Sequence, residues 1–376
     1  MKFVIEKDVL VAGLQQVINV VGTKLTMPIL SNVLIEGVAG HNQIALSTTN
    51  LDMGIRCVIR AEVTESGSIT LPVKKFASIV KALPHREVTC ELEGDLYLHL
   101  TSGSSHFKVL GLGANDFPAL PQFEVEQKIT INQLQLLRML RSISYAQSKD
   151  ENRYILNGVY FLVENGNVNF IATDGRRLAL ISSEVPSCNL EKSVIVPAKM
   201  IGELERTLGI GEGVQILMTD KQIAFAIDVE ADNANGICDH IYIVSKIVEG
   251  KYPNYKQVIP SSSDYRVRLD REQLLSVIQR VALVADEKNY SVRLKLADNL
   301  LEVSARSSIY GEARENLPIS YEEEAVTITF NPQFLTDPLK VLTNDEVYFE
   351  FKNDLSPGIV KTNDTFLCVI MPLRSN

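Results

Sequence analysis

The chain has 376 residues, of which 45% are hydrophobic and 22% are charged, the composition of an ordinary water-soluble globular protein. This length exceeds what one hydrophobic core usually serves, so it predicts two or three domains. The formal net charge of -9 argues against a protein that grips nucleic acid over its whole surface. Any role on nucleic acid would need basic residues gathered on one face.

No part of the sequence indicates a membrane segment or an export signal. No apolar run is long enough to cross a bilayer, and the N-terminus already contains Glu6 and Asp8 where a signal peptide would have its apolar core. We therefore expect a cytoplasmic protein with no membrane partner.

The cysteines and histidines are scattered and form no metal-binding pattern. The cysteines never stand as C-x-x-C, and no two histidines pair at the spacing of metal ligands on a helix. We expect reduced, mostly buried thiols, no metal site and no cofactor. The residues concerned are Cys57, Cys90, Cys188, Cys238, Cys368, His41, His85, His99, His106 and His240.

One local pattern, a strand that runs into a proline and then a helix, occurs three times, at residues 68–76, 193–200 and 326–335. Proline suits the first helical position because its missing N–H would be unpaired there anyway. The prolines are Pro72, Pro197 and Pro332, which are 125 (197 minus 72) and 135 (332 minus 197) residues apart.

A second repeated marker is a short strand that ends in a polar residue and opens a helix with apolar side chains at three-to-four spacing. Asn132 and Asp270 are good N-caps for two of these helices. Glu6 is a poorer cap, so we expect the first helix to begin a residue or two after it. The three copies span residues 3–17, 129–140 and 267–278.

Aromatic-proline connectors at residues 116–121 and 251–260 close the first two copies and are typical of extended linkers between domains. The sequence thus predicts an α+β protein of three repeated domains, each with two helices and largely antiparallel sheet. A unit repeated three times favours an assembly surface or a ring over a catalytic cleft. The expected domains are residues 1–124 (N-terminal), 125–261 (central) and 262–376 (C-terminal).

The stretch 172–179 lies between two apolar runs near the middle of the chain and contains Asp174 and Gly175, followed by Arg176 and Arg177. An Asp-Gly pair between apolar runs predicts the turn of a β-hairpin, with Gly175 at the positive φ that the turn requires. From the residues alone, this turn could be an anion clamp, a peptide pocket or a solvated hairpin end.

The triple repeat and six short stretches, in this order and spacing, resemble the bacterial DNA polymerase III β subunit family, the sliding clamps, from end to end. The resemblance implies a DNA clamp fold and a head-to-tail homodimer, a ring that encircles double-stranded DNA without sequence specificity, with helices lining the hole. It implies no catalytic activity. The implied partners are the DNA polymerase III α subunit, the clamp loader and other proteins that dock clamp-binding peptides. The stretches are residues 1–3, 27–32, 152–158, 172–179, 251–255 and 371–374.

The same resemblance implies a peptide pocket between the second and third domains. Its aliphatic walls would bury a leucine or phenylalanine of the peptide, while the turn and the chain end supply backbone partners and positive charge. In the alternative interpretation, Leu178, Leu355 and Ile370 belong to the core, and Arg176 and Arg177 are solvated. The implied pocket comprises Leu156, Thr173, Gly175, Arg176, Arg177, Leu178, Pro253, Val258, Leu355, Pro357, Val369, Ile370, Met371, Pro372, Leu373 and Arg374.

The resemblance also implies a basic lining that meets DNA phosphates without reading bases. Each of these side chains could instead be a solvated group on an amphipathic helix. A ring held by topology needs only weak phosphate contacts, which suits the net charge of -9. The implied DNA-facing residues are Lys24, Lys74, Arg138, Arg141, Lys149, Tyr154, Lys199 and Arg206, with Lys75, Lys81, Arg280 and Lys340 as further helical cations.

Ring closure would place an apolar edge of the first domain against the first helix of the partner's third domain. The residues expected there are Phe107 and Val109 on one side and Leu283 and Val284 on the other. In a monomer they would form an exposed apolar edge, which the dimer covers.

Two other classes of function compete with this interpretation. An enzyme could use Asp174 as acid or base and Arg176 or Arg177 as anion binders, but no G-x-S-x-G and no phosphate-binding loop accompanies them. The glycine-rich residues 209–213 follow a predicted helix and indicate its C-terminal loop. The third possibility is a β-rich interaction scaffold that never meets DNA. Gln257, where many members of the resembled family carry arginine, would remove a cationic contact from the pocket rim.

Overall fold

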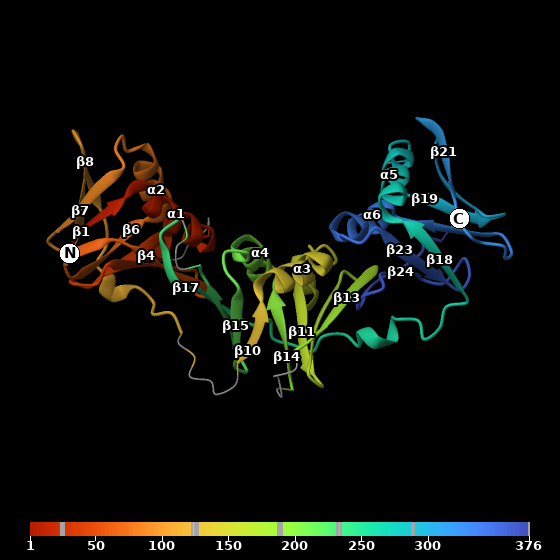
Figure 1. Ribbon diagram of the computed structural model, residues 1–376, viewed down its shortest axis with the longest axis horizontal. Helices are drawn as coiled ribbons and strands as arrows, with labels where there is room; N and C mark the ends of the chain where they lie inside the picture. The colour runs from red at the N-terminus through yellow and green to blue at the C-terminus, as the bar shows by residue number, and fades with distance from the viewer. Residues whose placement is uncertain are drawn as a thin grey trace. The chain divides into compact units, whose positions relative to one another are not determined.

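A computed structural model describes residues 1–22, 27–121, 123, 128–185, 191–230, 233, 235–286 and 290–374 (Figure 1). The chain forms two compact units. The first unit contains Met1–Leu137 with Gly202–Ile247, and the second contains Arg138–Ile201 with Val248–Asn376. No helix in the described part of the chain is long and apolar enough to span a membrane.

The elements recur in three similar series along the chain. The first series is β1 (Lys2–Glu6), α1 (Lys7–Val17), β2 (Asn32–Gly37), β3 (Gln43–Thr49), β4 (Met53–Arg60), β5 (Glu62–Glu65), β6 (Gly67–Pro72), α2 (Val73–Ala82), β7 (Glu87–Glu93), β8 (Tyr97–Ser102) and β9 (Ser105–Leu110). The second is β10 (Ile129–Asn132), α3 (Gln133–Ser144), the short 3-10 helix η4 (Glu151–Leu156), β11 (Gly158–Glu164), β12 (Asn167–Thr173), β13 (Arg177–Glu184), β14 (Lys192–Pro197), α4 (Ala198–Thr207), β15 (Gly213–Met218), β16 (Gln222–Asp228) and β17 (Ile237–Lys246). The third is β18 (Tyr265–Asp270), α5 (Arg271–Ala282), β19 (Val292–Ala297), β20 (Leu300–Ser307), β21 (Gly311–Pro318), β22 (Val326–Phe330), α6 (Pro332–Val341), β23 (Glu346–Phe351), β24 (Gly358–Lys361) and β25 (Phe366–Ile370).

The first helix of each series starts in the same way. The first amide of a helix has no partner within that helix. In each series this amide donates to a backbone oxygen of the residue directly before the strand that follows the second helix. The three bonds are Lys7 N to Arg86 O at 2.6 Å, Gln133 N to Glu212 O at 2.8 Å and Arg271 N to Asp345 O at 2.9 Å. The predicted triple repeat is therefore present in three dimensions.

The first helix begins within the expected range, whereas two of the helix starts predicted at prolines were wrong by one residue. Helix α1 begins at Lys7 directly after Glu6, although Glu6 makes no side-chain cap, because the backbone bond to Arg86 supplies the missing acceptor. Pro72 and Pro197 end strands β6 and β14, and the helices begin one residue later. Pro332 does occupy the first turn of α6, whose N-cap Asn331 accepts from Gln333 N.

The first unit contains a five-stranded sheet and an eight-stranded sheet. The five strands lie in the order β5-β1-β7-β8-β9, and the eight in the order β10-β15-β16-β17-β4-β3-β2-β6. The larger sheet is continuous between the first and second series because β4 and β17 pair antiparallel.

The second unit repeats this architecture with an eight-stranded and a four-stranded sheet. Their orders are β14-β11-β12-β13-β25-β24-β23-β18 and β21-β20-β19-β22. Here β13 of the second series pairs antiparallel with β25 of the third, and Figure 1 shows the yellow-green β13 beside the blue C-terminal strands. The α+β fold with two helices per repeat is confirmed, whereas the expected domain boundaries stay predictions.

The cysteines permit a chemical test of the packing. Burial raises the pKa of Cys57 and of Cys368 to about 12, so both thiols stay protonated at neutral pH and cannot attack as thiolates. Cys90 is also buried and Cys238 is half-buried, whereas Cys188 lies outside the described residues. Burial also raises the pKa of Cys238, but its side chain is partly exposed, so among the four described cysteines iodoacetamide should label Cys238, slowly, and leave the other three unlabelled until urea is added. Peptide mass spectrometry that finds Cys57 or Cys368 labelled in the native protein would contradict this packing.

Candidate docking site and nucleic-acid face

The central stretch forms the predicted hairpin turn between β12 and β13. Asp174 Oδ1 accepts hydrogen bonds from Arg176 N at 2.9 Å and Arg177 N at 3.1 Å. Thr173 Oγ1 accepts from Gly175 N at 3.1 Å and donates to Arg177 O at 2.6 Å. Gly175 has a φ of +84°, the left-handed value that glycine adopts without strain. Four hydrogen bonds therefore fix the shape of this turn.

A buried apolar cluster in the second unit joins this hairpin to distant parts of the chain. Leu178 of β13 pairs with Val369 of β25, and Ile359 of β24 lies against them. Tyr252 and Tyr255 of the second connector also belong to this cluster. The sequence neighbours of these buried residues are thereby held close together.

Several of these neighbours present exposed aliphatic side chains. Leu355 is 73% exposed, Val258 43%, and Met371 and Leu373 40% each. The chain end is fastened to the turn, because Met371 N donates to Arg176 O at 3.0 Å. A surface of this kind offers apolar contacts beside a hydrogen-bonded turn, which is what an extended peptide with an apolar anchor needs.

The predicted pocket residues divide into two groups. Leu178, Val369 and Ile370 are fully buried, so they form the floor beneath the surface, as the core interpretation expected. Leu355 is not a core residue, and Leu156 is half-buried against the cluster. The other predicted positions, Thr173, Gly175, Arg176, Pro253, Val258, Pro357, Met371, Pro372, Leu373 and Arg374, are exposed or half-buried.

Arg177 is neither an exposed pocket residue nor a solvated charge. Its side chain is only 7% exposed, and its guanidinium group is bonded to other parts of the chain. Its guanidinium contacts Asp174 Oδ2 at 3.0 Å and Asp337 Oδ2 at 2.6 Å, and it donates to Tyr145 O at 2.7 Å. The ring of Phe334 lies 4.6 Å from its central carbon. Burial works against the charge, but the two carboxylates outweigh it and raise the pKa of Arg177. Arg177 therefore offers no free charge to a ligand.

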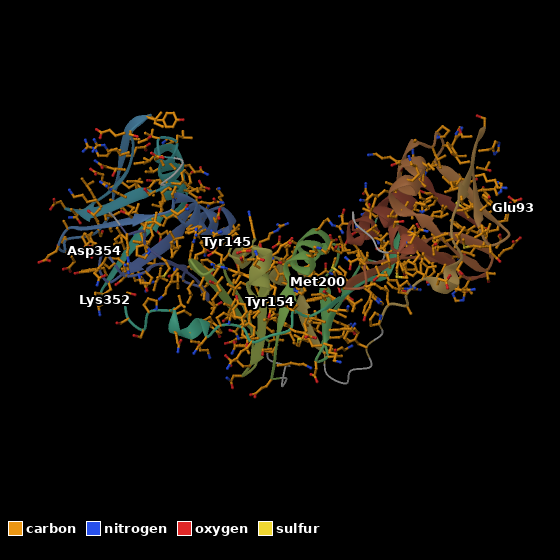
Figure 2. The ribbon with its side chains drawn as sticks, turned by 180° about the vertical axis from the view of Figure 1, so that it is seen from behind. Glu93, Tyr145, Tyr154, Met200, Lys352 and Asp354 are labelled. Carbon is orange, nitrogen blue, oxygen red and sulfur yellow. The ribbon has the colours of Figure 1, made fainter. Side chains whose placement is uncertain are left out.

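The partners of Arg177 were missed by the sequence interpretation. Asp337 lies on α6, 160 residues away, and Tyr145, labelled in Figure 2, follows the end of α3. No spacing rule connects such distant residues. The one available signal was the repeat itself, which would have directed attention to equivalent positions on the second helices.

The predicted cations on the described helices are exposed. Arg206 and Arg280 differ from the others in being ion-paired, Arg206 with Glu203 and Arg280 with Glu315. Tyr154 on η4, labelled in Figure 2, is 59% exposed. Lys24 lies outside the described residues. Exposed cations are Lys74, Lys75 and Lys81 on α2, Arg138 and Arg141 on α3, Lys149, Lys199 on α4 and Lys340 on α6.

The predicted edge residues need two corrections. Phe107 on β9 is 39% exposed, but Val109 on the same strand is only 9% exposed, so it already packs within one chain. Leu283 and Val284 do not lie on α5, which ends at Ala282; Leu283 is its C-cap and is 80% exposed, while Val284 is half-buried.

Known proteins match the whole chain. Family models for the DNA polymerase III beta subunit match residues 1–121 (N-terminal domain), 130–254 (central domain) and 256–374 (C-terminal domain). The beta sliding clamp of Chlamydia muridarum is 32% identical over 375 residues, covering 100% of this chain and 99% of that protein.

Solved structures agree with the sequence relatives. The sliding clamp of Pseudomonas aeruginosa bound to griselimycin is 33% identical with a TM-score of 0.90, and that of Bacillus subtilis is 29% identical with a TM-score of 0.92. Both alignments cover 100% of each chain. The fold is therefore that of the three-domain clamps. The chain belongs to the DNA polymerase III beta subunit family.

Proposed function

We propose that this chain is a DNA sliding clamp, a processivity factor that encircles duplex DNA as a dimeric ring in the cytoplasm and tethers the replicative polymerase. The observation that carries the proposal is the match of three consecutive family models along the whole chain. The polymerase α subunit, the clamp loader and other partners would dock through peptides at the hairpin surface.

The repeat itself supports a ring and suggests how it closes. Strand β4 of the first series pairs with β17, the last strand of the second, and β13 pairs with β25, the last strand of the third. The equivalent strand of the third series is β21, and the last strand of the first is β9. Each of these two stands at the edge of its sheet. Pairing of β21 with β9 of a second copy would build the same joint again and remove both open edges.

The charge distribution suits a protein that holds DNA by topology. Exposed cations such as Lys74, Arg138 and Lys199 lie on helices of the first two series, while the chain as a whole carries a charge of -9. Contacts from long side chains to phosphates carry no sequence information and are weakened by salt. Such contacts would leave the ring free to slide.

Docking would use the apolar surface around the turn. A leucine or phenylalanine of the partner would lie among the exposed side chains of Val258, Leu355 and Met371, above the buried cluster. Griselimycin, which the clamp of Pseudomonas aeruginosa binds, is a practical probe. We expect saturable binding of griselimycin to this protein and competition with a labelled peptide. A calorimetric titration without saturable heat would contradict the docking part of the proposal.

A catalytic use of the turn is not favoured. Both carboxylate oxygens of Asp174 are engaged, Oδ1 with two backbone amides and Oδ2 with Arg177 Nε. A general acid or base needs an oxygen that can reach a substrate proton. We therefore propose that the chain performs no chemistry of its own.

A further inference from the structure

In both units, a guanidinium group satisfies backbone oxygens at the end of the first helix of a series. Arg177 donates to Tyr145 O, the residue directly after α3. In the first unit, Arg206 donates to Gln15 O at 3.2 Å and Gln16 O at 3.1 Å, in the last turn of α1. Carbonyls at a helix end lack partners within the helix, and a cation there also suits the helix dipole.

The two guanidinium groups pair with carboxylates at closely similar places on the second helix of a series. Glu203 lies on α4, six residues after Pro197, and Asp337 lies on α6, five residues after Pro332. Glu203 pairs with Arg206, and Asp337 pairs with Arg177. Each unit thus joins two series, through β4 and β17 in the first unit and through β13 and β25 in the second. At both of these joints a helix end, a guanidinium group and a carboxylate lie together.

The source of the guanidinium differs between the joints. Arg206 lies on α4 itself, only three residues from Glu203. Arg177 lies in the turn between β12 and β13, residues 173–177, which we call the docking turn. Asp337 is 160 residues away in the sequence. In the second unit, the group that secures the helix end thus belongs to the docking turn.

The corresponding turn of the first unit shows that this arrangement is not needed to shape the turn. Asn50 Oδ1 accepts from Asp52 N at 3.0 Å and Met53 N at 2.8 Å, as Asp174 does from Arg176 and Arg177. Leu51 has a φ of +74°, close to that of Gly175. Met53, buried and uncharged, stands where Arg177 stands in the second unit.

We propose that Arg177 and Asp337 are positioning residues for peptide docking, which fasten the docking turn to α6 and to the end of α3. This inference rests on the proposed docking function. Neither side chain contacts the peptide; they hold the turn and the chain end, which is bonded to Arg176 O, in the arrangement that binds it. Peptide affinity therefore depends on a carboxylate of the third series that lies outside the apolar surface.

The first test is Asp337→Asn, which removes one of the two carboxylates around a buried guanidinium. The probe is a fluorescein-labelled synthetic peptide with a leucine and a phenylalanine anchor, measured by fluorescence anisotropy well below the melting temperature. We expect about tenfold weaker binding, the effect of losing one charge-assisted contact. Glu203→Gln is the matched control, because it removes the similarly placed carboxylate in the first unit and should leave peptide affinity unchanged.

A second variant separates positioning from stability. The triple substitution R177M/D337E/K340R transfers the residues of the first joint, Met53, Glu203 and Arg206, to the second. Arginine at 340 would then secure the end of α3 from α6 itself, so thermal stability should approach that of the wild type. Peptide binding should remain about tenfold weaker, because the turn is no longer fastened. Hydrogen exchange at the amides of Gly175 and Arg176 should be faster in this variant.

The possible results distinguish the positioning role of Arg177 and Asp337 from the docking function on which it rests. If Asp337→Asn binds the peptide as tightly as the wild type, or if the triple variant recovers full affinity, the positioning role is wrong while docking stands. If the wild type itself does not bind the peptide, the docking function fails and the positioning role fails with it.

Discussion

Removal of Met371–Asn376 is expected to abolish peptide docking and leave the dimer intact. The deletion removes the exposed side chains of Met371 and Leu373 and the bond from Met371 N to Arg176 O. It spares β25, which ends at Ile370 and carries the buried floor. Burial of one large aliphatic side chain contributes about 1.5 to 3 kcal/mol, so losing two should weaken binding at least about a hundredfold. Anisotropy with the labelled peptide measures the affinity, and light scattering the mass.

A shorter deletion provides the control. Without Ser375 and Asn376 alone, the chain keeps Met371 through Arg374, and its affinity should equal that of the full chain. A chain that ends at Ile370 and still binds the peptide normally would show that the docking surface lies elsewhere.

Introducing a charge at the two exposed edge positions is expected to convert the dimer to monomers. Phe107→Asp acts on edge strand β9, and Leu283→Asp acts on a side chain that is 80% exposed in the single chain. A carboxylate buried in an apolar interface without a partner is strongly destabilising. Because both side chains are exposed in one chain, the fold itself should survive. The mass measured by light scattering should fall from that of a dimer, twice the chain mass of 41.8 kDa, to that of a single chain.

The matched control is Val38→Asp, an equally drastic change at a side chain that is 56% exposed after β2 and far in sequence from either edge. This variant should remain a dimer. Val109→Asp is unsuitable, since Val109 is buried within the chain and a buried carboxylate there would destabilise the fold itself. A dimeric mass for the Phe107/Leu283 double variant would refute the proposed closure.

Short sequence motifs predicted the structural features that depend only on neighbouring residues. The Asp174-Gly175 turn followed from the need for a positive φ, and the triple repeat followed from strands that open helices at a regular spacing. The starts of α2 and α4 did not follow, because Pro72 and Pro197 end strands instead of opening helices.

The burial of single side chains in the site could not be predicted from the pattern. Leu178 and Leu355 are both leucines beside apolar runs, yet one is buried under the connector tyrosines and the other is 73% exposed. Arg177 was expected either in the pocket or as a solvated charge, because nothing in the sequence connects it with Asp337, which is 160 residues away and holds it together with Asp174 of the same turn. Only the packing of the second and third series brings them together.

The most direct test of the central claim is retention on circular DNA. The protein is loaded onto nicked circular duplex DNA with a bacterial clamp loader and passed through a gel-filtration column in moderate salt, which suppresses simple phosphate binding. A ring held by topology should elute with the circles and come off when a restriction enzyme linearises them. Protein that leaves circular and linear DNA equally fast, or that stays on linear DNA, would contradict the clamp function.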